Sequence, residues 1–309
     1  MTEGSGINLS VNLGRIKLKN PVVTCSGTFS SGLEYSEFYD VGILGAVTTK
    51  SFSLGSRAGN PPPRIWETAC GMLNSIGLQN EGIDFFIKNH LPEIKSLGAG
   101  IILSIFGDNL GEFKKIARKV KKIESSLLAV ELNLSCPNVK EGGIAFSSMP
   151  AEVEKITEAV CKILEIPLIV KLSPNSDSII ESAARAKCGG AEAVSIINSI
   201  VGTAIDIDTF KPRLGNITGG MSGPAIKPIA LAKVYFLAKA NILPIIGMGG
   251  ICDWSDAVEF LVAGASAIGV GTANFVDYEA GKKIIDGIRN YLNKKGINDI
   301  NKIIGKAIC

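Results

Sequence analysis

The sequence LLAVELNLSCPNVKEGG, at residues 127–143, shows the pattern on which the chain is built, an apolar strand that runs into a polar turn. Residues 127–134 form an apolar run of strand type. Cys136 follows between two asparagines, Asn133 and Asn138, and the proline after it favours an extended backbone at the cysteine. A thiol held between carboxamides is suited to act on a polar, planar substrate. A buried structural cysteine at a strand end explains the same residues equally well.

Similar apolar runs recur along the chain, with amphipathic helical stretches between them. The expected strands are 22–24, 46–49, 101–105, 128–132, 168–172, 193–197, 245–247 and 267–270. Apolar strands that alternate with helices are typical of a parallel sheet covered on its faces. Eight such units predict an α/β fold, a (β/α)8 TIM barrel with its helices outside.

The remaining segments complete this picture. Alternating hydrophobicity over residues 7–19 predicts a hairpin that caps the bottom of the barrel. The stretches 109–125 and 151–164 have helical periodicity, and 283–306 predicts the eighth helix and an extra one. No domain boundary is visible, so residues 1–309 are expected to form a single domain.

Two connections, 51–80 and 199–222, exceed the usual length of about two to six residues. Long loops after the strands of such a barrel normally build its active site.

Composition excludes several classes of protein. With 46% hydrophobic and 20% charged residues, the chain can fill a large core, and its net charge of +3 gives no sign of nucleic-acid binding. The polar start, MTEGSGINLS, is unlike a signal peptide, and no apolar run approaches the roughly 20 residues of a membrane span. The scattered cysteines contain no C-x-x-C, so no metal site is expected. These features indicate a cytoplasmic protein with reduced thiols.

Two lysines stand directly after apolar runs, Lys50 in VTTKS and Lys171 in IVKLSP. An unpaired lysine is rarely buried, and neither has a carboxylate beside it in the sequence. Glu131 lies inside its strand and is expected to face the helix layer. A bound anion is therefore the economical partner for the two lysines.

Glycines at two neighbouring strand ends suggest that the anion is a phosphate group. PIIGMGGI (244–251) and AIGVGT (267–272) place glycines where strands meet the following helices, and Gly223 opens another helix. That corner of a barrel commonly holds a phosphate. Tight turns and close packing are the alternative explanation. The pattern lacks the G-x-G-x-x-G of a dinucleotide site.

Few residues of the sequence could act as a catalytic base. The single histidine, His90, precedes Leu91-Pro92 in an expected helix, where a structural role is favoured. The expected strand ends carry no paired carboxylates. Cys136 is therefore the best candidate, because a thiol titrates at about pH 8.5, near enough to neutral for general-base work.

Several motifs together resemble the dihydroorotate dehydrogenase family, over about residues 8 to 275. They are GNPPPR (59–64), GMLNSIGLQN (71–80), ELNLSCPNVKEGG (131–143), VKLSPN (170–175), IINS (196–199), NITGGMSGPAIKP (216–228), PIIGMGGI (244–251) and GASAIGVGTANF (264–275). The Ser-Cys-Pro-Asn loop is most similar to the class 1B catalytic subunit, which uses cysteine as its base. The membrane-bound class 2 enzymes use serine.

The resemblance implies FMN as the cofactor and dihydroorotate as the substrate. Cys136 would take the C5 proton while hydride leaves C6 for flavin N5, which gives orotate, an intermediate of pyrimidine biosynthesis. The implied substrate-binding residues are Lys50, Asn74, Ser75, Ile76, Gly77, Leu78, Asn133, Asn138, Asn198 and Ser199. The implied FMN-binding residues are Ser26, Lys50, Ser51, Ser104, Asn133, Lys171, Ile197, Gly223, Gly249, Gly250, Gly271 and Thr272.

Three positions depart from the family's pattern. Ser104 stands where asparagine is frequent, Ser199 where threonine is common, and Cys25 where a small residue is usual. These departures bear on flavin affinity rather than on the base.

The electron acceptor lies outside this chain, which has no NAD fingerprint and no cluster ligands. The class 1B relatives pair with a subunit that carries FAD and a [2Fe-2S] cluster and pass electrons to NAD+, so a heterotetramer of two catalytic and two partner chains is expected. Three alternatives stay open. They are a class 1A-like homodimer that uses fumarate, another FMN-dependent dihydropyrimidine oxidoreductase, and a non-catalytic flavin-binding or assembly protein.

Overall fold

An eight-stranded parallel sheet forms the centre of the computed structural model, which describes residues 6–135, 146–176 and 178–309. In sheet order the strands are β3 (Val22–Thr24), β16 (Ala267–Val270), β15 (Ile245–Met248), β10 (Ala193–Ile196), β9 (Leu168–Lys171), β8 (Ala129–Asn133), β7 (Ile101–Ile105) and β4 (Val47–Thr48). A parallel bridge between Val23 and Ala46 joins the two edge strands and closes the barrel. The predicted barrel is confirmed, with each strand end within one residue of its expected place.

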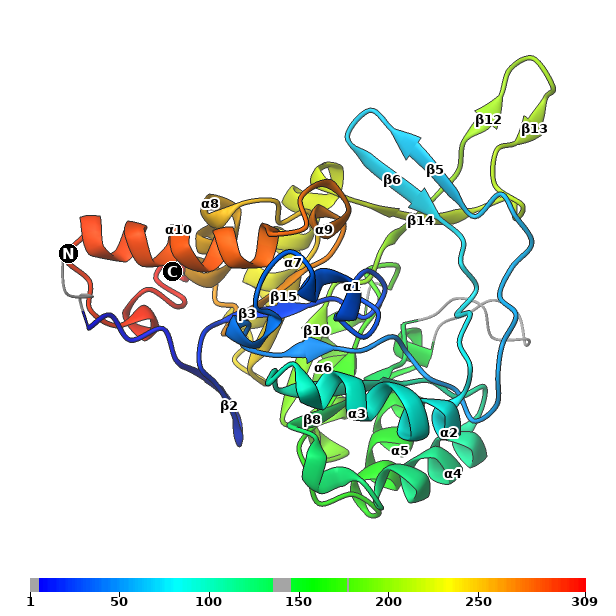
Figure 1. Ribbon diagram of the computed structural model, residues 1–309, viewed down its shortest axis with the longest axis horizontal. Helices are drawn as coiled ribbons and strands as arrows, with labels where there is room; N and C mark the ends of the chain where they lie inside the picture. The colour runs from blue at the N-terminus through cyan, green and yellow to red at the C-terminus, as the bar shows by residue number, and fades with distance from the viewer. Residues whose placement is uncertain (1–5, 136–145, 177) are drawn as a thin grey trace.

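Helices surround the barrel (Figure 1). The longer ones are α3 (Leu91–Ser96), α4 (Leu110–Val120), α5 (Pro150–Cys161), α6 (Ile179–Cys188), α7 (Lys227–Lys239), α8 (Trp254–Val262) and α10 (Ala280–Lys294); α1 (Leu33–Ser36), α2 (Ile83–Phe85) and α9 (Ala273–Val276) are short. The helices expected at 109–125 and 151–164 are confirmed. No helix in the described part of the chain is long and apolar enough to cross a membrane.

The expected extra helix near the C-terminus is wrong. After α10 the chain forms only a 3-10 turn, Ile300–Lys302. Gly296 and Gly305 both have positive φ, 66° and 73°, which a right-handed helix cannot contain. The two glycines therefore interrupt any helix that would continue from α10 through residues 296–305.

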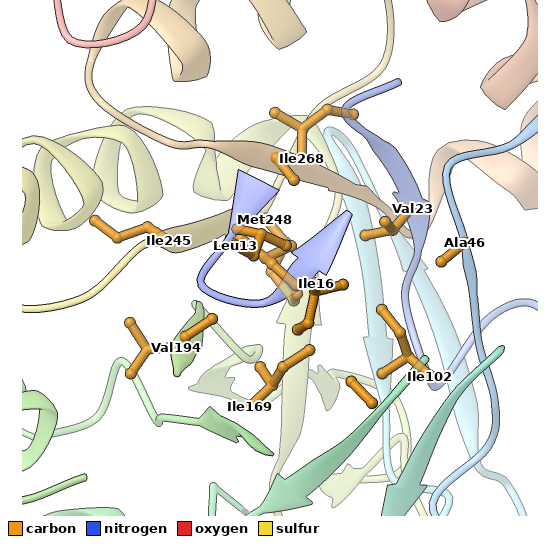
Figure 2. Close-up of a cluster of buried hydrophobic side chains, with 14 of the residues drawn as sticks. Leu13, Ile16, Val23, Ala46, Ile102, Ile169, Val194, Ile245, Met248 and Ile268 are labelled. Carbon is orange, nitrogen blue, oxygen red and sulfur yellow. The ribbon is translucent and has the colours of Figure 1, made fainter. Parts of the chain in front are cut away.

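The N-terminal hairpin caps the barrel as expected. Strands β1 (Val11–Leu13) and β2 (Ile16–Leu18) pair antiparallel. Leu13 and Ile16 are buried and lie among side chains of the barrel strands (Figure 2). Arg15 forms an ion pair with Glu192, just before β10, so the hairpin covers the end of the barrel where the strands begin.

The two long connections form a second sheet that was not predicted. Its order is β11 (Ile200–Gly202), β14 (Gly219–Ser222), β6 (Gly71–Asn74) and β5 (Ile65–Thr68), all antiparallel. A smaller hairpin, β12 (Ile205–Asp206) with β13 (Lys211–Pro212), extends beyond it (Figure 1). The segments 51–80 and 199–222 are thus joined to each other by backbone hydrogen bonds.

Candidate active site

Polar residues and glycines gather where the barrel strands end. Ser26 follows β3, Lys50 and Ser51 follow β4, Ser104 lies in β7, Asn133 and Lys171 end β8 and β9, Ile197–Ser199 follow β10, Gly249 and Gly250 follow β15, and Gly271 and Thr272 follow β16. In a closed parallel barrel the carboxyl ends of all strands meet at one rim. The fold therefore brings together residues that lie far apart in the sequence.

Hydrogen bonds connect four of these polar side chains and Ser135 across the barrel mouth. Ser51 Oγ lies 2.8 Å from Ser104 Oγ, and Asn133 Nδ2 donates to Ser51 Oγ at 2.9 Å. Asn133 Oδ1 accepts from Ser135 Oγ at 2.9 Å. Asn198 Nδ2 donates to Ser135 Oγ at 2.7 Å. The carboxamides of Asn133 and Asn198 are thus held by a continuous chain of hydrogen bonds.

The second sheet brings Asn74 to the same place. Asn74 Nδ2 donates to the carbonyl of Gly220 at 3.2 Å. A Cβ at Gly220 would lie 2.0 Å from Ser199 Oγ, so this glycine lets β14 approach the end of β10. The backbone of Gly220 on β14 therefore lies next to both Asn74 and Ser199.

The loop after β6 has a structure of its own. The Ser75 hydroxyl accepts hydrogen bonds from the side chains of Asn60 and Asn216. Gly77 and Leu78 both adopt positive φ, 74° and 56°. Residues 75–78 therefore form a tight, anchored turn beside Asn74.

Lys171 is almost completely buried, at 6% exposure, and its ammonium group donates to Ser26 Oγ at 3.3 Å. The structure corrects one expectation here. Glu131 does not face the helix layer: its carboxylate accepts from Ser104 on β7 and from Ser195 on β10, which places it inside the barrel. Lys171 therefore has a buried carboxylate on the neighbouring strand, although none lies beside it in the sequence.

Cys25 lies under the same mouth. Its thiol is 3.8 Å from the sulfur of Met248 and close to Gly269 and Gly271. Burial raises the pKa of this thiol to about 12, while Lys171 lowers it and Glu131 raises it. Cys25 is therefore a neutral thiol at physiological pH and cannot serve as the base.

This assignment gives a first prediction. Cys25→Ala is expected to leave the pH dependence of substrate-driven cofactor reduction unchanged between about pH 6 and 9, because a group with a pKa of about 12 does not titrate there. Rapid-mixing kinetics across that range measure it. A shift in the apparent pKa of the rate would show that Cys25 takes part in the proton transfer.

Glycines form a cradle at the rim between β15 and α7. Gly223, Gly249 and Gly250 have positive φ of 93°, 127° and 75°. A Cβ at Gly250 would lie 2.8 Å from the carbonyl oxygen of Gly223 and from the amide nitrogen of Lys227. Thr272 Oγ1 donates to Ser222 Oγ at 2.9 Å, which joins β16 to the same corner. Glycine turns at the end of a strand and the start of a helix are the kind of backbone that binds phosphate.

Other predicted residues lie around this mouth. Ile197 is buried, and its amide donates to the carbonyl of Met248. Lys50 lines a small pocket with Thr49, Phe52 and His90. Cys136 and Asn138 lie outside the described residues. Their neighbour Ser135 is held between Asn133 and Asn198.

Sequence reasoning missed four residues of this network, Ser135, Ser195, Gly220 and Ser222. Ser135 stands next to the candidate base and could have been found from that position. Ser195 lies in the middle of an apolar strand, and nothing in the sequence links it to Glu131. Gly220 and Ser222 belong to a sheet that was not predicted.

Comparison with known proteins gives one consistent answer. Residues 8–292 match the family model described as dihydroorotate dehydrogenase. The chain is 50% identical over 299 residues to the catalytic subunit of dihydroorotate dehydrogenase B (NAD(+)) from Alkaliphilus oremlandii, covering 97% of this chain and 98% of the relative. The protein of the same name from Bacteroides thetaiotaomicron is 47% identical over 298 residues, with 96% and 98% covered. A crystal structure of DHODH from Eimeria tenella in complex with ferulenol superposes with a TM-score of 0.79 at 23% identity, over 97% of this chain and 88% of that one.

Proposed function

The chain belongs to the dihydroorotate dehydrogenase family, and we propose that it is an FMN-dependent catalytic subunit whose Cys136 is the base. The enzyme oxidises dihydroorotate to orotate in pyrimidine biosynthesis, with NAD+ as the acceptor. The observation that supports the assignment to this site is that three features lie at the same rim of the barrel. A buried lysine, an anion cradle and two oriented carboxamides occupy the same end of the barrel.

The residues present fit FMN. The cradle of Gly223, Gly249 and Gly250 suits its phosphate, because three glycines with positive φ meet where β15 ends and the segment before α7 begins, and such glycine turns bind phosphate through backbone N–H groups. Lys171 supplies a cation where the reduced flavin carries negative charge. When bound, FMN supplies the acceptor for the hydride that leaves C6 of the substrate.

The chain's own residues bind and orient the substrate. Asn74, Asn133 and Asn198 carry carboxamides, each with a donor and an acceptor, and these match a ring that carries both amide N–H and carbonyl groups. Ser199 lies beside Asn198, whose Oδ1 accepts from the Ser199 amide at 2.8 Å. Cys136 follows Ser135 directly in the sequence, and Ser135 is held by the same hydrogen bonds that orient Asn133 and Asn198.

A partner subunit completes electron transfer in this proposal. The relatives are named as catalytic subunits, which implies a second chain. We infer that the partner carries FAD and a [2Fe-2S] cluster and that the complex is a heterotetramer of two catalytic and two partner chains. The cytoplasm is the expected location.

An anaerobic titration tests the function directly. The purified chain, reconstituted with FMN where necessary, is mixed with dihydroorotate while the visible spectrum is recorded. Bleaching of the flavin band is expected. A band that stays oxidised would contradict dihydroorotate as the substrate. Rapid reoxidation of the lone chain by fumarate would contradict the NAD+-linked complex in favour of the homodimeric class.

The phosphate cradle gives a second prediction. Gly250→Ala is expected to weaken FMN binding about tenfold or more, because alanine at positive φ costs roughly 1–2 kcal/mol and its methyl group meets Gly223 and Lys227. Fluorescence titration of the FMN-free protein measures the dissociation constant. Gly55→Ala is the control, since a Cβ there has no atom within 4 Å. Equal FMN affinity in the two variants would place the phosphate elsewhere.

A further inference from the structure

Glu131 and Lys171 stand apart from the other charged residues in the described chain, because they alone are buried, at 2% and 6% exposure. They lie on the neighbouring strands β8 and β9. A buried charge is tolerated when it is paired and hydrogen-bonded. The mechanism above uses Lys171 and leaves the carboxylate of Glu131 without a role.

The carboxylate of Glu131 lies inside the barrel, in the region of Lys171. Glu131 is the register partner of Ile169, two residues before Lys171 on β9. Its Oε2 accepts from Ser195 Oγ at 2.8 Å, and Ser195 on β10 is the register partner of Lys171. The side chain of Glu131 thus crosses the inner face of β9 to reach β10.

The hydrogen bonds above Glu131 have a fixed direction. An ionised carboxylate only accepts, so Ser104 must donate its proton to Oε1, at 3.0 Å. Ser104 then accepts from Ser51, and Ser51 accepts in turn from the amide group of Asn133. Asn133 therefore presents its NH2 to Ser51 and its oxygen to Ser135.

The same direction continues to the last carboxamide. Ser135 donates to Asn133 and accepts from Asn198 Nδ2, and Asn198 Oδ1 accepts from the Ser199 amide. Both carboxamides that read the substrate ring thus have one orientation, and the chain of bonds that sets it begins at a buried negative charge.

We propose that Glu131 is a positioning residue whose negative charge balances Lys171 beneath the flavin and fixes the orientation of the Asn133 and Asn198 carboxamides. The inference rests on the proposed function, since the flavin and the substrate are those of that proposal. Glu131 touches neither of them. It acts through Ser104 and Ser51 on the substrate side and through its charge on the Lys171 side.

Glu131→Gln tests both actions. A glutamine donates as well as accepts, so Ser104 no longer has to donate to residue 131, and both directions of the chain become available. Orotate is expected to bind about tenfold more weakly, the effect of disordering a charge-assisted hydrogen bond. Loss of one negative charge near Lys171 is expected to raise the midpoint potential of the bound flavin. Orotate titration of the flavin spectrum and dye-coupled photoreduction measure the two quantities.

A control variant separates charge and direction from general disturbance. Glu192→Gln removes a carboxylate that pairs with Arg15 outside the barrel. The Glu192→Gln protein is expected to keep the wild-type potential and orotate affinity, and so is a Glu192→Ala protein. If either quantity stays at the wild-type value in a Glu131→Gln protein that folds and holds FMN, the proposal is overturned.

A further variant covers the case in which Glu131→Gln does not fold. Ser104→Ala keeps the charge of Glu131 but interrupts the chain of hydrogen bonds, so it is expected to weaken orotate binding. Unchanged orotate affinity in Ser104→Ala would overturn the proposal. The potential is measured without dihydroorotate. A wild-type protein that holds FMN but is not reduced by dihydroorotate would contradict the proposed function and not this inference.

Discussion

Cys136→Ala is expected to slow the reduction of bound flavin by dihydroorotate about 10²- to 10⁴-fold, the usual effect of losing a general base. The other thiol and the carboxylate that the structure describes at the site are not placed to take the C5 proton. Cys25 is a neutral thiol, and Glu131 is separated from the mouth by Ser104 and Ser51. Anaerobic rapid mixing at one pH, with the absorbance of oxidised flavin as the signal, measures the rate.

The controls for this experiment lie on the same chain. Cys188→Ala removes an exposed thiol on α6 and is expected to react at the wild-type rate. FMN content and orotate affinity should be unchanged in Cys136→Ala, because the carboxamides are held by Ser51 and Ser135. A reduction rate within a few-fold of the wild type would remove Cys136 as the base.

The barrel could be predicted from the sequence because its strands are buried on both sides. Such strands appear as short continuous apolar runs, and 101–105 and 267–270 match the structure residue for residue. The second sheet could not be predicted in this way. Strands such as GMLN and GGMS are partly exposed, rich in glycine and without alternation, and they are stabilised by pairing with each other over about 150 residues of sequence.

The direction of the Glu131 side chain is a second feature that could not be predicted from the sequence. In a strand whose two faces are both buried, the apolar pattern has no period of two, so the sequence does not tell which face points into the barrel. The two serines that donate hydrogen bonds to Glu131 lie 27 and 64 residues away in the sequence. The glycine corners and the asparagines were easier to find, because they stand at strand ends, which the fold gathers at one rim.

Lys171→Met is expected to lower the free energy of unfolding of the FMN-free protein by about 1–3 kcal/mol, because Ser26 loses its hydrogen bond from the Lys171 ammonium group. The substitution also leaves the buried Glu131, on the neighbouring strand, without a buried positive charge close by. Urea unfolding followed by circular dichroism measures the change. Lys187→Met, at an exposed position on α6, is the control and is expected to stay within about 0.5 kcal/mol of the wild type.

The double variant Lys171→Met with Glu131→Gln decides whether the two charges interact. If they do, the second substitution removes the unpaired charge and restores much of the lost stability, so the two effects are not additive. Additive losses would show that the two residues are independent. A double variant that is stable but whose flavin is poorly reduced would mean that folding does not require the pair. The barrel would then hold two buried charges for the chemistry at its mouth, one to stabilise the reduced flavin and one to balance that cation and orient the substrate's carboxamides.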